Sequence, residues 1–299
     1  MKKILISSMN GPIAIELISY LKKKFYIIGC DRQSFGLGKK ICDEFYISPN
    51  GNSVKFINFL NKIGKKVDQI FLFADEELLN VSINRKKLKN VINKILISPH
   101  KTIHLCNNKD LLKKFLKKEL YKPISENNKV IIKPKIGRGS KNQIILNDKK
   151  NNFYNFFSKK NEFIIEKFID GKEFTVDCVF DKKNTLIFAL PRERIIKSNL
   201  SIVGKISKNQ KILNYINNLS TKLNFIGNVN IQVILDKKKN IHLIDINPRV
   251  SGSIIFSIMA GFDPFLMAYS INNNLKINMP TKIKYDEIFY RYWKTYNKY

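Results

Sequence analysis

Two β-strand patterns separated by four polar residues constrain the fold of this chain most strongly. Residues 228–236 (NVNIQVILD) and 241–247 (IHLIDIN) are rich in apolar and β-branched residues, and the four residues KKKN lie between them. This pattern predicts an antiparallel hairpin with a four-residue loop. In that register Gln232 lies opposite Asp245, and cross-strand partners share a face with Cβ atoms about 5 Å apart. His242 is expected on the opposite face, because side chains alternate along a strand.

The second strand of this hairpin ends in polar groups. Asp245 and Asn247 share a face, and Pro248 ends the strand just before Arg249. Mg²⁺ takes carboxylate and neutral oxygens together with waters and substrate phosphates, and arginine binds phosphate or carboxylate in bidentate fashion. We therefore expect Gln232, Asp245 and Asn247 to bind Mg²⁺ (or Mn²⁺) beside Arg249. The alternative is a polar trio on a solvated sheet face that ends in an Asn-Pro turn.

The first hundred residues alternate strand and helix patterns. Strands are predicted at 4–7, 25–30 and 69–73, with helices at 11–24 and 54–63 between them. This order predicts a doubly wound parallel sheet. A further helix is expected after the acidic run 75–77, and a short strand is expected at 95–97. The loop SMNGP after the first strand has only one glycine of the dinucleotide fingerprint, which disfavours NAD binding.

A different pattern follows Pro99. A Lys-rich helix over 109–120 precedes a strand over 130–134 (VIIKP), a turn over 135–142 (KIGRGSKN) and a strand over 143–146. A Walker P-loop would instead run into a helix. Glycines in the turn allow backbone N–H groups to approach phosphate, and the lysine that precedes Pro134 is placed to reach the α- and β-phosphates. The alternative is a plain hairpin turn.

Two acidic residues flank a short apolar linker further along. Residues 163–167 read as a strand, and a second strand begins after Gly171. The linker between them can offer backbone hydrogen bonds to adenine. Glu166 and Glu173 can accept hydrogen bonds from ribose hydroxyls, and each can equally be a surface residue.

The chain is strongly basic. Lys and Arg number 54 against 24 Asp and Glu, which gives a formal net charge of +30. The excess is mostly Lys in short dispersed runs, and no helix-turn-helix, zinc-finger or RNP-type signature accompanies it. We expect no specific nucleic-acid partner, although the charge should attract anionic ligands such as nucleotides.

Neither a membrane segment nor a disulfide framework is expected. No segment reaches membrane-spanning length, and the N-terminus (MKKILISS) lacks a long apolar region with a cleavage site. We therefore expect a cytoplasmic protein. Cys30, Cys42, Cys106 and Cys178 are scattered without metal-ligand spacing, which favours reduced, structural cysteines.

Taken in order, these pieces resemble the ATP-grasp superfamily. Within it they are most similar to a single synthetase half of the carbamoyl-phosphate synthase large chain and to small stand-alone carboxylate-amine ligases. The residues that carry the resemblance span most of residues 100–265 and are Lys109, 132–134 (IKP), 137–140 (GRGS), 166–173 (EKFIDGKE), Gln232 and 245–253 (DINPRVSGS).

The resemblance implies a fold of α/β and α+β class. It implies an N-terminal doubly wound parallel-sheet (pre-ATP-grasp) domain over 1–98, then an ATP-grasp domain over 99–272. The latter divides into subdomains of about 99–165 and 166–272. Aromatic residues at helical spacing over 285–299 predict that the remaining tail, 273–299, is helical. Such a helix packs on the body or on a second copy, so a homodimer is left open.

The resemblance also implies roles for individual residues. ATP would lie between the two subdomains, in contact with Lys109 and Lys133. The residues expected over the phosphates are Gly137, Arg138, Gly139 and Ser140. Those expected around adenosine are Glu166, Lys167, Phe168, Ile169 and Glu173. Those expected to act in phosphoryl transfer are Lys133, Asn247 and Arg249. Asp245 stands where many relatives carry Glu.

The implied activity is ligation of a small-molecule carboxylate to an amine. ATP would phosphorylate the carboxylate, and the amine would attack the acyl phosphate. The substrate contacts are sought among Arg192, Arg194, Ser251 and Gly252, and the alternative for the arginines is an exposed ion pair with Glu193. The chain carries one such half, so carbamoyl-phosphate synthesis itself is not expected. The competing hypothesis is a non-catalytic ATP-binding or regulatory protein that retains the fold.

Overall fold

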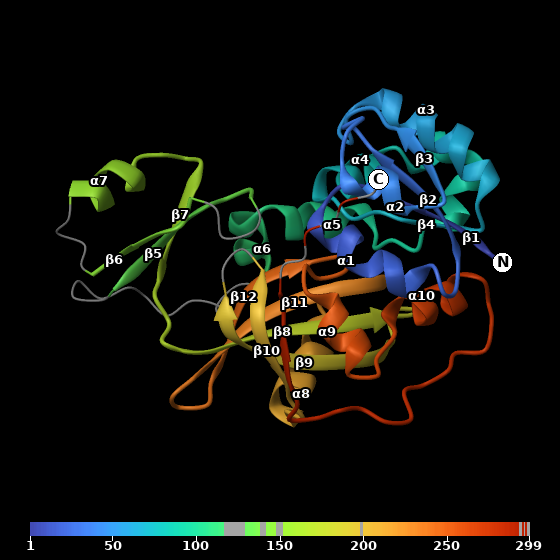
Figure 1. Ribbon diagram of the computed structural model, residues 1–299. Coiled ribbons are helices and arrows are strands. Elements are labelled where there is room, and N and C mark those ends of the chain that lie inside the picture. Colours follow the sequence, from blue (N-terminus) through green and yellow to red (C-terminus); the bar gives the residue numbers. More distant parts are fainter. Residues whose placement is uncertain are drawn as a thin grey trace.

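The computed structural model describes residues 1–116, 129–137, 142–147, 152–197 and 200–292, with residues 295 and 297. Within these residues the strands form three sheets (Figure 1). A parallel sheet belongs to the N-terminal part of the chain, a large antiparallel sheet forms the body, and a small antiparallel sheet stands apart at one side. The α/β and α+β class that we expected is confirmed.

The N-terminal sheet confirms the doubly wound prediction. Its elements are β1 (Lys3–Ile6), α1 (Pro12–Leu21), β2 (Tyr26–Asp31), α2 (Leu37–Ile41), β3 (Glu44–Ile47), α3 (Val54–Ile63), η1 (Gly64–Lys66), β4 (Gln69–Phe71), α4 (Asp75–Ile83) and η2 (Arg85–Lys94). The strand order is β3-β2-β1-β4, and all pairs are parallel. Ile4 and Ile6 join one apolar cluster while Leu5 joins another, because alternate side chains of β1 leave opposite faces.

The strand predicted at residues 95–97 is wrong. Ile95 and Ile97 are buried as the apolar pattern indicated, but they lie in a loop. The Arg85 guanidinium donates hydrogen bonds to the carbonyls of Ile97 (2.9 Å) and Ser98 (2.7 Å). These carbonyls are therefore satisfied by a side chain and not by a neighbouring strand.

The two faces of the large sheet differ because side chains alternate along its strands. Its strands are β8 (Gly171–Phe180), β9 (Leu186–Lys197), β10 (Ser201–Ile206), β11 (Gly227–Asp236), β12 (Ile241–Asn247) and β13 (Ile288–Tyr290), in the order β12-β11-β8-β9-β10-β13. Val229, Ile231 and Val233 point to a buried apolar cluster. Asn230 and Gln232 point to the other face and line a cavity. The odd and even residues of one strand therefore serve the core and the cleft respectively.

Helices cover one face of this sheet and only part of the other. The helices concerned are α5 (His100–Asn107), α6 (Lys109–Leu116), α8 (Gln210–Ser220), α9 (Ile254–Met259) and α10 (Pro264–Asn272). Residues of α5, α6 and α8 share the apolar cluster beneath β8 and β11. Residues of α9 and α10 pack with Val179, Leu190 and Ile206 on the opposite face. The polar part of that face stays open toward the small sheet.

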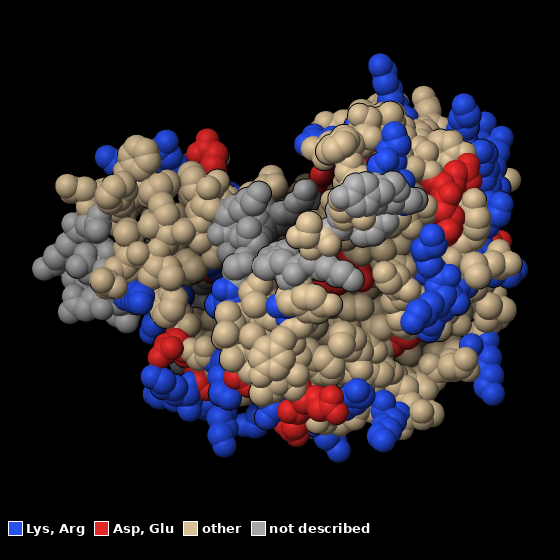
Figure 2. Space-filling view, viewed as in Figure 1, with Lys and Arg blue, Asp and Glu red and all other residues tan. Residues whose placement is uncertain are grey.

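The small sheet faces this open area. It consists of β5 (Val130–Pro134), β6 (Ile144–Leu146) and β7 (Phe163–Lys167), in the order β6-β5-β7, with α7 (Asn152–Ser158) beside it. Its apolar cluster is centred on Val130, Ile132 and Leu146. Figure 2 shows this part as a separate lobe, with a deep notch between it and the N-terminal domain.

The helical tail predicted over 273–299 is wrong where the chain is described. Residues 273–287 contain no α-helix, and β13 pairs with β10 as an edge strand, with Phe289 opposite Gly204. Phe289 is buried in the cluster formed with α9 and α10, whereas Tyr290 on the other face of β13 is exposed, as the alternation of a strand requires. Trp293 and Tyr296 lie outside the described residues.

The shared core beneath β11 predicts a large loss of stability on truncation. Ile231→Ala should lower the free energy of unfolding by about 2–5 kcal/mol, because Ile231 is fully buried and the substitution leaves a cavity. Urea denaturation measures this change. Ile83→Ala is the matched control, since Ile83 is 60% exposed, and its effect should stay within about 0.5 kcal/mol. Equal effects of the two substitutions would contradict the packing described.

Candidate functional site

A cavity of about 1090 Å³ lies between the small sheet, the open face of the large sheet and the N-terminal domain. The segment 167–171 that joins β7 to β8 forms one wall. Most of the expected site residues line this cavity: Lys109, Lys133, Gly137, Glu166, Lys167, Phe168, Ile169, Glu173, Arg194, Gln232, Asp245, Asn247, Arg249 and Gly252. Arg138, Gly139 and Ser140 lie outside the described residues.

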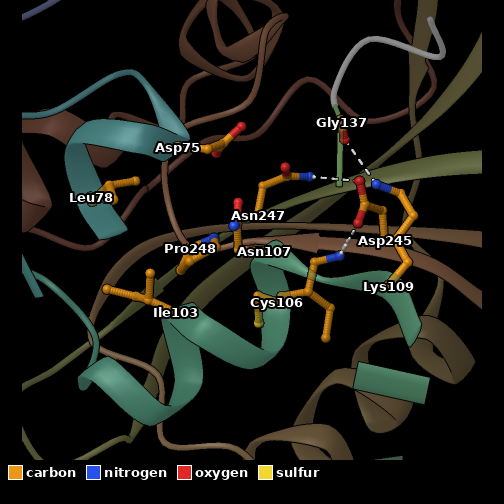
Figure 3. Close-up of a pocket in the computed structure, with 11 residues that line it drawn as sticks. Asp75, Leu78, Ile103, Cys106, Asn107, Lys109, Gly137, Asp245, Asn247 and Pro248 are labelled. Atoms are coloured by element: carbon orange, nitrogen blue, oxygen red, sulfur yellow. Dashed lines mark hydrogen bonds between the residues drawn. The ribbon is translucent and has the colours of Figure 1, made fainter. Parts of the chain in front are cut away.

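The predicted hairpin and its pairing of Gln232 with Asp245 are confirmed, although the register shifts by one residue nearer the turn. Gln232 pairs with Asp245 and Asn230 pairs with Asn247 across β11 and β12. The Asn247 Nδ2 lies 3.5 Å from Asp245 Oδ2, and the Ile246 N–H donates to Asp245 Oδ1 at 3.2 Å (Figure 3). The polar trio therefore comes together on the cleft face.

A β-bulge changes the position of His242. Gln232 pairs with Asp245, but the next residue, Val233, pairs with Leu243, so one residue of β12 is left unpaired. His242 thereby comes opposite Ile234 and lines the same cavity as Asp245. The prediction that His242 lies on the face opposite Asp245 is wrong for this reason. Its Nε2 lies 2.9 Å from Asp236 Oδ2.

A small pocket of about 20 Å³ adjoins the polar trio. Asp75, Asn107, Lys109, Asp245 and Asn247 line it, and their side chains surround a common space in Figure 3. This volume holds about one water molecule or ion. Asp75 is paired with Arg249, which leaves the carboxylate of Asp245 and neighbouring amide oxygens as donors. Mg²⁺ takes such a set when phosphates and waters complete its shell.

The carboxyl group of Asp245 is held in an unfavourable environment for a lone negative charge. Burial raises its pKa, and the nearby charge of Lys109 acts in the opposite direction. Asp75 also raises the pKa of Asp245, whereas Lys133 and Arg249 lower it. A divalent cation would stabilise the ionised form here, so the donor set and its electrostatics both suit a metal ion.

Arg249 is bound by a carboxylate from the N-terminal domain. Its Nε donates to Asp75 Oδ1 at 2.6 Å and its Nη2 to Asp75 Oδ2 at 2.9 Å. The same Nη2 lies 3.3 Å from Asn247 Oδ1. Asp75 is the first residue of α4, which begins four residues after the end of β4. Sequence reasoning read Asp75 only as part of a helix start, and missed that the carboxyl end of the parallel sheet faces the end of the hairpin.

Lysines and acids that line the cavity beside the small sheet have partners within the protein. Lys133 Nζ lies 2.9 Å from Glu166 Oε2, and Lys109 Nζ donates to the Gly137 carbonyl at 2.8 Å. Glu173 forms ion pairs with Arg194 and Lys197. Burial alone would raise the pKa of Glu173, but these two cations outweigh burial and lower it.

Arg192 and Arg194 both lie on β9 but differ in exposure. Arg192 is fully buried, where it contacts Asp177 (3.3 Å), Ser201 Oγ (3.2 Å) and Ser251 Oγ (3.4 Å). The structure therefore does not bring Arg192 or Ser251 to the surface of the cavity, whereas Arg194 lines it.

The exposed ion pair that was the alternative for these arginines is also wrong. Glu193 pairs with Lys172 across the neighbouring strand, with an N–O distance of 3.1 Å. Arg194 instead forms an ion pair with Glu173. Side chains alternate along a strand, so Arg192 and Arg194 lie on one face of β9 and Glu193 lies on the other. The polar side chains of β9 therefore divide between the cleft face and the outer face.

Comparison with known proteins finds a family model and relatives that are similar to parts of this chain. A family model described as "ATP-grasp in the biosynthetic pathway with Ter operon" matches residues 159–287. The carbamoyl phosphate synthase large chain of Clostridium botulinum is 28% identical over 216 residues. That match covers 68% of this chain but 19% of the relative, so the chain spans about a fifth of its length.

Solved structures agree over nearly the whole chain. N5-carboxyaminoimidazole synthetase from Staphylococcus aureus superposes with a TM-score of 0.73 at 16% identity, covering 93% of this chain and 78% of that one. The chain has the ATP-grasp fold. The biotin carboxylase domain of Hydrogenobacter thermophilus 2-oxoglutarate carboxylase, solved as a dimer with MgADP and bicarbonate, gives 0.71 at 17% identity, covering 96% and 73%. The expected ATP-grasp resemblance is thereby confirmed.

Among the helices of the described ranges, none combines the length and apolar character needed to cross a bilayer.

A buried carboxyl group lies at the edge of the cavity. Glu77 Oε1 accepts a hydrogen bond from the Ser8 hydroxyl at 3.1 Å, and its Oε2 accepts from the Ser7 hydroxyl and from the Ala74 N–H. Ser8 lines the cavity. Burial raises the pKa of Glu77 from 4.5 to about 7, although the hydrogen bonds from the two serines and Ala74 act in the opposite direction.

This shift predicts a specific pH dependence of stability. The folded chain binds the Glu77 proton more tightly than the unfolded chain, so the stabilisation is complete below the unfolded pKa and is lost as pH rises through about 7. Between about pH 5 and about pH 8, wild type should lose up to about 3 kcal/mol of unfolding free energy relative to Glu77→Gln. Urea denaturation at both pH values measures the difference.

Glu287→Gln is the control for this experiment, because Glu287 is exposed at 53% of its side chain. Its unfolding free energy should follow wild type at both pH values. A parallel pH response of wild type and Glu77→Gln would contradict the raised pKa.

Proposed function

We propose that this chain is an ATP- and Mg²⁺-dependent carboxylate-amine ligase that forms ADP and acts through an acyl phosphate. The observation that carries the proposal is a single cavity with two different ends. One end has an apolar slot beside the 167–171 segment, and the other has Asp245, Asn247 and Arg249. The ATP-grasp fold supports the same assignment.

The first end suits a nucleoside. Ile131 and Ile145 of the small sheet face the cavity from one side, and Ile234 and Ile244 of the large sheet face it from the other. A planar base would fit between two such apolar surfaces, with backbone groups near Phe168 within reach of its edge. Lys109 and Lys133 would contact the phosphates, and Glu166 and Glu173 the adenosine.

The second end suits the metal and the reacting phosphate. Gln232, Asp245 and Asn247 would hold Mg²⁺, whose chemistry is to neutralise phosphate charge and align the γ-phosphoryl group. Asn247 now directs its Oδ1 toward Arg249 and its Nδ2 toward Asp245. Rotation of this amide would turn the oxygen to the metal and release an Arg249 donor for phosphate.

The proposed chemistry needs alignment and charge neutralisation but no protein nucleophile. A carboxylate oxygen of the substrate attacks the γ-phosphorus, and the bond to the ADP oxygen breaks. The amine nitrogen then attacks the acyl carbon, the carbon–oxygen bond to phosphate breaks, and the amine loses a proton. Arg249 supplies positive charge where the transferring phosphoryl oxygens gather. The partners are thus a small-molecule carboxylate and an amine.

The alternative is a non-catalytic ATP-binding protein with the same fold. The presence of Gln232, Asp245, Asn247 and Arg249 around one cavity favours the enzyme, because binding alone does not require a phosphoryl-transfer arginine beside the metal trio. Amine-dependent ADP release, screened with Mg²⁺ over a panel of amino acids, separates the two. Bound ATP without turnover for any acid and amine would favour the alternative.

The role of Arg249 predicts a selective loss of turnover. Arg249→Lys keeps one positive charge but removes the bidentate fork, so kcat for ADP release should fall by about 10²–10³. Equilibrium dialysis should show that ADP affinity changes little. Arg32→Lys, at an exposed position away from the cavity, is the control. An unchanged kcat in Arg249→Lys would exclude its proposed role.

The role of Asp245 predicts a metal-specific defect. Asp245→Asn removes the only carboxylate of the proposed donor set and should weaken Mg²⁺ binding in the ADP complex by at least about tenfold, the loss that even outer-shell changes can produce. Titration with Mg²⁺, followed by calorimetry, measures the change. Asp286→Asn, whose side chain is 76% exposed, should bind Mg²⁺ as wild type does. Equal metal affinity in all three proteins would be inconsistent with the proposed site.

A further inference from the structure

The part of the cavity beyond Arg249 is lined by apolar side chains. Pro12 and Ile13 begin helix α1, Phe73 follows β4, Leu200 directly precedes β10, and Ile202 is its second residue. These residues come from three distant parts of the chain, and all of them line the same cavity. The proposed nucleotide and metal contacts use none of them.

Arg291 joins two of these parts, the start of α1 and the start of β10. Its guanidinium donates to both carboxylate oxygens of Glu16 on α1, at 3.0 and 2.6 Å. It also donates to the carbonyls of Ser201 and Gly252, each at 3.0 Å. Ile13 lies one turn before Glu16, so the apolar wall from α1 is tied to the wall from β10. The apolar region is therefore built by an ion pair whose arginine side chain is only 6% exposed.

The apolar region is contiguous with the reacting end of the cleft. Gly252 lies three residues after Arg249, and a Cβ atom on Gly252 would come within 2.3 Å of Leu200 Cδ2. On the opposite wall, Phe73 lies two residues before Asp75, the carboxylate partner of Arg249. A molecule with its carboxylate near Arg249 therefore has its other end against these side chains.

We propose that the cleft takes a carboxylic acid with an apolar side chain, which packs among Ile13, Phe73, Leu200 and Ile202. This inference rests on the proposed function for the direction in which the carboxylate points. The four side chains carry no charge and no hydrogen-bonding group, so a charged substrate side chain would lose its hydration there without a partner. An apolar chain instead gains free energy in proportion to its buried surface.

A homologous series of acids tests the apolar subsite without turnover. Acetate, butyrate and hexanoate are titrated by calorimetry into the full chain with MgADP. Affinity should rise roughly fourfold for each methylene group that is buried, so hexanoate should bind at least about tenfold tighter than acetate. Leu200→Asn should reduce this ratio severalfold, while the affinity for MgADP itself stays unchanged.

Leu275→Asn is the matched control. Leu275 is 53% exposed and lies outside the cavity lining, so this variant should keep the wild-type ratio. Equal affinities along the series, no detectable binding of any member, or an unchanged ratio in Leu200→Asn would each overturn the subsite.

ADP release, measured with the same acids and a panel of amines, separates this inference from the proposed function. Graded binding without ADP would remove the ligase and keep the subsite. ADP formation that does not depend on chain length would remove the subsite and keep the ligase.

Discussion

The register between β11 and β12 is the constraint on which the whole site depends. A slip of one residue would move Gln232 from the cleft to the core, because side chains alternate with a period of two. Burial of Ile231 and Val233 on β11 and of Ile246 on β12 fixes the register from the core side. The polar trio on the cleft face is thus held in place by apolar contacts on the other face of the sheet.

The pairing of Asp75 with Arg249 extends this constraint to the N-terminal domain. Asp75 follows a strand of the parallel sheet, and Arg249 follows the last strand of the hairpin, so one ion pair joins the ends of two separate sheets. The charge of Asp75 raises the pKa of Asp245, and the positive charges of Lys109, Lys133 and Arg249 act in the opposite direction. The balance of these charges is what makes this end of the cleft suitable for a cation bound together with phosphate.

The sequence predicted those features that depend on interactions between residues close together in the chain. The pairing of Gln232 with Asp245, strands β1, β2 and β4 with helices α1 and α3, and strand β5 follow from apolar periodicity and turn residues, and the structure confirms them. Helix α2 and strand β3 were not predicted. The β-bulge that turns His242 to the cleft has no signal in that periodicity. The expectation for residues 285–292 failed because aromatic spacing does not distinguish a helix from an edge strand that packs on α9.

Contacts between distant segments account for the remaining differences. Arg192 was expected either to contact a substrate or to form an exposed ion pair, but Asp177, two serines and Phe256 bury it completely. Asp75 and Arg291 acquire their partners at separations of 174 and 275 residues along the chain. Such pairings follow from the packing of whole domains, and a single sequence does not reveal them.

The claim that the hairpin end holds a divalent cation beneath a nucleotide is tested most directly by a crystal structure of the chain with ADP and Mg²⁺. The account predicts Mg²⁺ about 2.0–2.1 Å from oxygens of Asp245 and Asn247, between these side chains and the diphosphate. A nucleotide bound outside the cavity, or Mg²⁺ coordinated only by phosphate and water with Asp245 still turned toward Asn247 Nδ2, would contradict it.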